Sequence, residues 1–132
     1  MDSSRLTLTN RPENLKLLLD FVQKWAKKHG LPHRKLDYLV HAAGEIFRHL
    51  LDHAYQPGEP GSIAVELTSK GPRLRLMFED DALPSNNPEA GRTPAGPPSP
   101  GAPHFTRLLR LVESLIYYRT ADRKNRLVVF LN

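Results

Sequence analysis

One run of apolar residues at helical spacing, between residues 33 and 55, constrains this chain more than any other feature of its sequence. Its members recur at steps of three and four residues, which places them along one side of an α-helix. They are Leu36, Leu39, Val40, Ala43, Phe47, Leu50, Leu51 and Ala54. The spacing therefore predicts a long helix from about His33 to Tyr55, with one side buried in the core of the domain.

A second face of the same helix carries ionisable side chains. His41, Glu45, His49 and His53 follow one another at four-residue steps, and side chains at this spacing lie one above the other on a helix. Two imidazoles one turn apart, with a carboxylate one turn earlier, have the spacing of a helical transition-metal site. Packed or solvent-facing imidazoles are the commoner occurrence, so the pattern alone leaves both interpretations open.

The chain has 132 residues, which suits a single domain with one core. Its net charge of +5 is spread over several segments without a dense basic block, and this favours solubility or an acidic protein partner over nucleic acid. The absence of cysteine excludes disulfides and thiolate metal sites. No apolar run is long enough for a membrane span, and Met1–Ser4 lacks a signal-peptide core. We therefore expect a cytoplasmic protein that does not enter membranes.

The remaining segments alternate between strand and helix periodicity. The expected elements are a strand at 5–9, a helix from about 12 to 30, the helix at 33–55, a β-hairpin with strands at 63–67 and 74–78, a helix from 105 to 115, and strands at 116–120 and 127–131. Between them, residues 82–103 are rich in Pro, Gly, Ala, Ser and Asn, which predicts a mobile loop. Three helices on one face of a mostly antiparallel mixed sheet give an α+β fold, a two-layer α/β sandwich.

The long helix also carries a motif. Glu45, the polar position at His49, and residues 52–55, which read Asp-His-Ala-Tyr, resemble the N-box helix of the bacterial anti-sigma-factor serine kinases. These kinases are a branch of the GHKL (Bergerat, histidine kinase-like) ATP-binding fold. The family pattern is Glu-x-x-x-Asn followed by a His-Ala-Tyr ending, and this chain has His49 where the magnesium-binding Asn belongs. The order of elements resembles one such domain over residues 5–131, with 82–103 as its lid loop.

The resemblance also assigns a nucleotide-binding position. Residues 78–82, Phe-Glu-Asp-Asp-Ala, are similar to the family's Asp-x-Gly motif, which gives Asp80 the adenine amino group and sets Ala82 where glycine is usual. A carboxylate suits an exocyclic amine in an apolar pocket, where an unpaired donor would be costly. Without the resemblance, Asp80 would simply end a strand beside a polar loop.

The phosphate-binding segment departs further from the family. Where the family has a glycine-rich lid before its third helix, residues 101–107 read Gly-Ala-Pro-His-Phe-Thr-Arg. Gly101 is kept, His104 replaces a glycine, and Pro103 has no amide N–H to offer a phosphate. Side chains such as His104 and Thr106 are the remaining candidates for phosphate contacts. We therefore expect ATP or ADP to bind weakly.

The resemblance gives Glu45 the role of general base toward a serine hydroxyl. Magnesium prefers oxygen ligands, so the imidazole of His49 is a poor replacement for an Asn carbonyl. Phosphoryl transfer depends on metal-aligned phosphates and charge neutralisation. We therefore expect poor magnesium binding and a degenerate kinase site rather than an active enzyme.

As a function, the resemblance favours a bacterial transcription regulator that works by protein–protein binding, with weak or lost ATP binding. The implied partners are a sigma factor, a STAS-type anti-anti-sigma protein, and a second copy of the chain. Two alternatives stay open. One is an active ATP- and magnesium-dependent serine-protein kinase that uses Glu45, and the other is a metal-binding module that uses His49 and His53.

Overall fold

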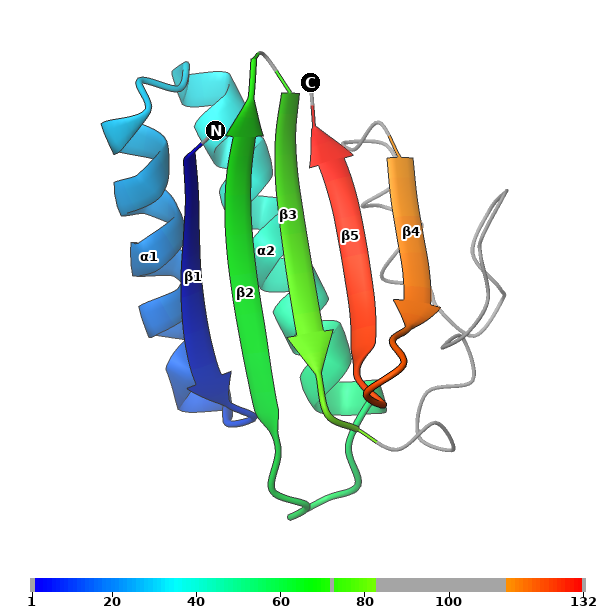
Figure 1. The fold of residues 1–132 in the computed structure, drawn as a ribbon. Coiled ribbons are helices and arrows are strands. Elements are labelled where there is room, and N and C mark those ends of the chain that lie inside the picture. The colour runs from blue at the N-terminus through cyan, green and yellow to red at the C-terminus, as the bar shows by residue number, and fades with distance from the viewer. Residues whose placement is uncertain (1, 72, 83–113, 132) are drawn as a thin grey trace.

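The computed structural model of the protein describes residues 2–71, 73–82 and 114–131. In chain order the elements are β1 (Asp2–Thr9), the 3-10 helix η1 (Pro12–Asn14), α1 (Leu15–Lys28), α2 (His33–His53), β2 (Ser62–Lys70), β3 (Arg73–Asp80), β4 (Ser114–Arg119) and β5 (Asn125–Leu131). Figure 1 shows two layers, with both helices covering one face of a single sheet. This arrangement confirms the predicted α+β class.

The sheet has the strand order β1-β2-β3-β5-β4, and its neighbouring strands all pair antiparallel in the described part of the chain. It differs in this respect from the expected mixed sheet. β5 lies between β3 and β4, so the β2–β3 hairpin and the β4–β5 hairpin meet along β3 and β5. In that pairing Phe78 lies opposite Leu127, and Asp80 lies opposite Asn125. The buried apolar side chains along β3 and β5 are thus followed, at one end of the two strands, by the polar pair Asp80 and Asn125.

The core lies between the two helices and the sheet. Its largest fully buried side chains, among the described residues, are Leu18, Leu39, Ile46, Phe47, Leu50, Ile63, Leu67, Leu74, Leu76, Phe78 and Leu127. Side chains alternate between the two faces of a strand, so one row of each strand enters this core. Truncating Phe47 or Phe78 to alanine would cost about 3–5 kcal/mol of stability, as is typical for a buried aromatic.

The first long helix stops where the sequence predicts. Gly30 has φ +66°, a left-handed conformation that glycine adopts at little cost. Its N–H donates to the carbonyl of Lys27, and the N–H of Leu31 donates to the carbonyl of Ala26. These two bonds form a Schellman motif, which satisfies carbonyls that the end of α1 would leave unpaired. The motif turns the chain back so that α2 can pack beside α1.

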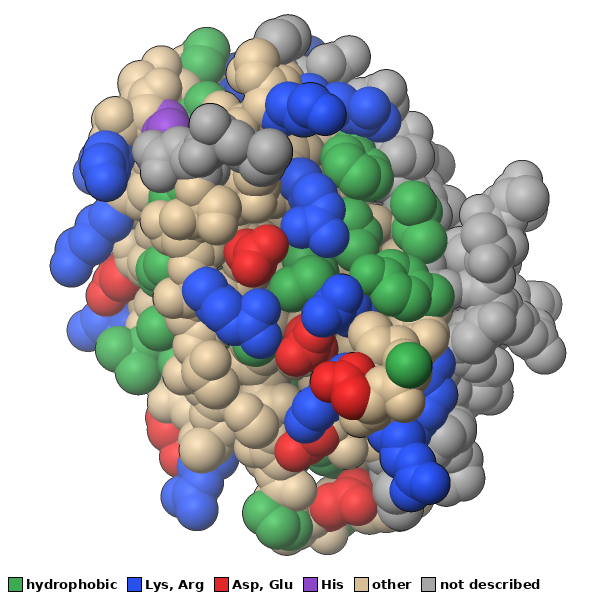
Figure 2. All heavy atoms as spheres, in the orientation of Figure 1, with side chains coloured by type: hydrophobic (Ala, Val, Ile, Leu, Met, Phe, Trp, Pro, Cys, Tyr) green, Lys and Arg blue, Asp and Glu red, His purple; other side chains and the backbone are tan. Residues whose placement is uncertain are grey.

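The face of the sheet turned away from the helices carries charged side chains. Glu79 accepts a bond from Arg126 Nε at 2.7 Å and one from Arg5 Nη2 at 3.2 Å, while Glu66 lies 3.3 Å from Arg75 Nη1. Figure 2 shows acidic and basic side chains interleaved over the middle of this face, with apolar side chains gathered beside them. Both glutamates of this face are therefore paired with arginines of the same chain.

Some predicted elements differ from the structure or fall outside it. The loop at 82–103 and most of the helix expected at 105–115 lie outside the described residues, except Ala82, which is described. Leu115, placed by its spacing in that helix, belongs to β4 instead. Within the described ranges, no helix has the length and apolar character needed to cross a membrane.

Candidate functional site

The carboxylate of Asp80 lies at the end of β3, and only 3% of the residue is exposed. Asn125 Nδ2 donates a hydrogen bond to its Oδ1 at 2.8 Å, and the backbone N–H of Ala82 donates to the same oxygen at 3.0 Å. The structure thus brings Asp80 and Ala82, both predicted as site residues, into direct contact. Both donors act on one oxygen of the carboxylate.

Asn125 is the residue that organises this end of the sheet. It is fully buried, and its Nδ2 also donates to the carbonyl of Ala82 at 2.9 Å. Its Oδ1 accepts a bond from Arg119 Nη1 at 2.9 Å. One side chain therefore connects the end of β3, the residue that follows Asp81, and the end of β4. Sequence reasoning gave Asn125 no role, because only the pairing of β5 with β3 brings it opposite Asp80.

Opposing influences act on the charge of Asp80. Burial raises the pKa of its carboxyl group, whereas the hydrogen bonds from Asn125 and Ala82 lower it. The neighbouring carboxylate of Asp81 raises the pKa, and the guanidinium of Arg119 lowers it. Hydrogen bonds from protein donors favour the ionised form of a buried carboxylate. Because the ionised form carries acceptors only, it is able to accept a further bond from a ligand.

The next carboxylate, Asp81, is held by Tyr55, which lies two residues after the end of α2. The hydroxyl of Tyr55 donates to Asp81 Oδ1 at 2.8 Å, and the N–H of Ser62 donates to the same atom at 3.0 Å. Burial and the bond to Asp81 hold the pKa of Tyr55 above its usual value, so the hydroxyl keeps its proton. The backbone of Gly61 passes so close to the Tyr55 ring that an added Cβ would lie 2.1 Å from Cε1. Sequence reasoning included Tyr55 in a motif but assigned it no contact.

Glu45, the predicted general base, lies on the polar face of α2 with two basic neighbours. Its Oε1 is 3.9 Å from His41 Nε2 and 3.8 Å from Arg48 Nη1. Its side chain is only partly accessible. The four-residue spacing predicts that His41 and Glu45 lie side by side, one turn apart on the helix, and the structure confirms this.

The two imidazoles that follow Glu45 also lie together. The ring centroids of His49 and His53 are 4.7 Å apart, with an angle of 40° between the rings, and His49 is only 4% exposed. Among the described side chains, no group of three or more histidines and acids is placed to hold a metal ion. Metal binding at His49 and His53 stays a prediction. The predicted phosphate residues Gly101, His104 and Thr106 lie outside the described residues.

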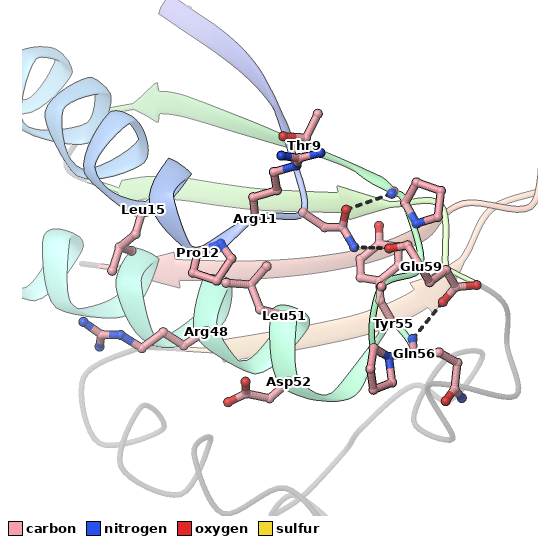
Figure 3. Close-up of a pocket in the computed structure, with 15 residues that line it drawn as sticks. Thr9, Arg11, Pro12, Leu15, Arg48, Leu51, Asp52, Tyr55, Gln56 and Glu59 are labelled. Atoms are coloured by element: carbon pink, nitrogen blue, oxygen red, sulfur yellow. Dashed lines mark hydrogen bonds between the residues drawn. The ribbon is translucent and has the colours of Figure 1, made fainter.

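A hollow of about 660 Å³ lies beside the C-terminal end of α2. Figure 3 shows it surrounded by side chains from the end of β1, from the last turns of α2 and from the loop at 56–61. Asn10 closes one side, because its Nδ2 donates to the carbonyl of Glu59 and its Oδ1 accepts from the N–H of Gly61, both at 2.8 Å. Tyr55 lines this hollow and also bonds Asp81, whereas Asp80 and Asn125 take no part in it.

Comparisons with known proteins agree with this architecture. A family model described as the histidine kinase-like ATPase domain matches residues 8–128. The crystal structure of the RsbU and RsbW domains of Rv1364c from Mycobacterium tuberculosis is similar, with a TM-score of 0.71 at 16% sequence identity. The alignment covers 100% of this chain and 32% of that one, so the chain spans about a third of its length. At this identity the likeness shows the fold alone. No curated protein matches the sequence.

Proposed function

Because this chain belongs to the histidine kinase-like ATPase domain family, we propose that it is a regulator similar to the anti-sigma-factor serine kinases. In this proposal it binds adenine nucleotides weakly and acts by binding protein partners. The candidate partners are a sigma factor, a STAS-type anti-anti-sigma protein and a second copy of the chain. The RsbW domain in the structural neighbour's title supports this choice of partner class, which we also base on the motif at Glu45 and residues 52–55.

The proposed nucleotide binding is supported chiefly by the hydrogen bonding of the Asp80 carboxylate. Its Oδ1 accepts from two protein donors, and within the part of the chain that the structure describes Oδ2 is the oxygen left to accept from a ligand amine. A buried acceptor of this kind favours a ligand that supplies the matching donor, because a buried polar group without a partner is costly. The exocyclic amine of adenine supplies that donor.

We expect the phosphates to bind weakly because this sequence differs from the family pattern at the residues that contact phosphate and magnesium. A lid with Pro103 and His104 offers fewer flexible backbone N–H groups than a glycine-rich one. Histidine at position 49 offers nitrogen where magnesium prefers oxygen. The purine would therefore contribute most of the binding free energy, and magnesium would add little.

Titration of ADP and ATP into the protein, with and without magnesium, tests this proposal by thermal shift. Ligand binding to the native state raises the melting temperature, so both nucleotides should raise it modestly and independently of magnesium. Asp80→Asn should abolish the rise, while Asp122→Asn, in the exposed β4–β5 turn, should leave it intact. If neither nucleotide raises the melting temperature, the proposed nucleotide binding is wrong. Pairwise binding assays with purified sigma factors and STAS proteins test the proposed binding of protein partners.

The kinase alternative is supported by the retention of Glu45 beside Arg48. It predicts a magnesium-dependent rise of several degrees with ATP, and transfer of the terminal phosphate to a partner serine. Glu45→Gln would abolish that transfer.

The metal-binding alternative is supported by the adjacent rings of His49 and His53. It predicts a stoichiometric transition metal that is lost in the His49→Ala, His53→Ala double variant.

A further inference from the structure

We propose that Asn125 is a positioning residue that makes this site select a 6-amino purine over a 6-oxo purine. It does so by holding Asp80 in the role of hydrogen-bond acceptor. The inference rests on the proposed binding of adenine nucleotides at Asp80, and it adds a residue that sets the specificity of that binding.

The orientation of the Asn125 amide is determined by its surroundings. Arg119 Nη1 donates to Asn125 Oδ1 at 2.9 Å, so this end of the amide must be the carbonyl oxygen. Nδ2 then donates to Asp80 Oδ1 at 2.8 Å and to the carbonyl of Ala82 at 2.9 Å. A flipped amide would set two donors against each other at Arg119 and two acceptors against each other at Asp80. The network therefore has one consistent arrangement.

This arrangement determines which bond Asp80 offers to a ligand. Asn125 and the N–H of Ala82 are both bonded to Oδ1, and these two bonds favour the ionised carboxylate, in which Oδ2 is an acceptor. A 6-amino group donates to that oxygen, whereas a 6-oxo group would oppose it with a second acceptor. Leaving both acceptors unpaired in a buried site would weaken 6-oxo binding by about tenfold or more.

Asp80 would change role without Asn125. Among the described residues, three other ionisable groups face it: Asp81 beside it, Arg119 from β4, and the protonated Tyr55 from the segment just after α2. Burial and Asp81 already raise the pKa of the Asp80 carboxyl, and the bond from Asn125 is the largest influence that lowers it. Removing that bond favours the protonated acid, which donates a hydrogen bond and so matches a 6-oxo group.

The test compares, by isothermal titration calorimetry, the affinities of ADP, which has a 6-amino group, and IDP, which has a 6-oxo group and a proton on N1. The wild-type protein should prefer ADP by about tenfold or more. Asn125→Leu has similar size but no donor, so it should lower this preference, and by more at lower pH than at higher pH. Arg126→Gln, at the next residue on the opposite face of β5, should keep the wild-type ratio at every pH.

Arg119→Leu provides a second, milder variant if Asn125→Leu does not fold. It leaves the amide in place but removes the group that orients it, so the ADP preference should fall without vanishing. Equal weakening of ADP and IDP in these variants, with an unchanged ratio, would mean a merely structural role and overturn the inference. Wild-type protein that binds both nucleotides equally would overturn the inference alone. If the wild-type protein binds neither ADP nor IDP, both the proposed nucleotide site and the inference about Asn125 are wrong.

Discussion

The hydroxyl of Tyr55 donates a 2.8 Å hydrogen bond to Asp81 Oδ1, which ties the end of α2 to the residue that follows the candidate purine-binding carboxylate. Ser62 supplies a second donor to the same oxygen. Three segments of the chain therefore meet at one carboxylate: the residues just after α2, the start of β2 and the residue after β3. The phenol group of Tyr55 joins the first of these segments to the other two.

Tyr55→Phe should destabilise the protein by about 1–2 kcal/mol, because it removes one hydrogen bond to a carboxylate and leaves the ring in place. Urea denaturation monitored by circular dichroism measures this change. Tyr118→Phe is the matched control, since its hydroxyl has a long contact of 3.4 Å to Arg126 on the open face of the sheet. Equal losses in the two variants would show that the Tyr55–Asp81 bond contributes nothing specific.

Gly61→Ala should be destabilising by about 1–3 kcal/mol, the usual range for overpacking a buried site. The added methyl group would overlap the Tyr55 ring, which it would approach to 2.1 Å. The double variant with Tyr55→Leu tests this cause, because a smaller side chain leaves room for the methyl group. If Gly61→Ala costs as much in the Tyr55→Leu background as in the wild type, contact with the ring is not the reason.

Asp80 should make stability fall as the pH rises. Its pKa in the folded protein is raised above the ordinary value of 3.8 by burial, so the folded state binds the proton more tightly than the unfolded state does. The resulting stabilisation is complete below the unfolded pKa and is lost as the pH rises through the folded pKa. Asp80→Asn removes this dependence, so its stability relative to wild type should be greater at about pH 8 than at about pH 4. Chemical denaturation at both pH values measures the difference, and an opposite trend would contradict the assignment.

Glu79 links two arginines across the open face of the sheet. Its bonds to Arg126 and Arg5 should make Glu79→Gln destabilising by about 1 kcal/mol at low salt, and by less at high salt because ions screen exposed pairs. Glu13→Gln is the control, since its only ion pair among the described residues joins exposed side chains 3.9 Å apart. Thermal denaturation at two salt concentrations measures both variants, and an effect of Glu79→Gln that persists in high salt would argue for packing rather than charge.

The parts of the fold that a local pattern determines could be predicted from the sequence. The apolar spacing placed α2 within two residues of its observed end, and Gly30 correctly marked the end of α1. Leu115 was misplaced because a short apolar run fits a helix and a strand equally well until its partner strand is known. The hydrogen bond between Asp80 and Asn125 could not be predicted, since it depends on the register of strands whose residues are far apart in the chain.

That register has a consequence for synthesis on the ribosome. Asp80 and Asn125 are 45 positions apart, and β3 borders β2 on one side and β5 on the other. A chain synthesised only as far as β3 does not yet contain Asn125, so the Asp80 carboxylate has no amide partner at that stage. In the proposed site, the residue that positions Asp80 is therefore supplied only when β5 has been made and pairs with β3.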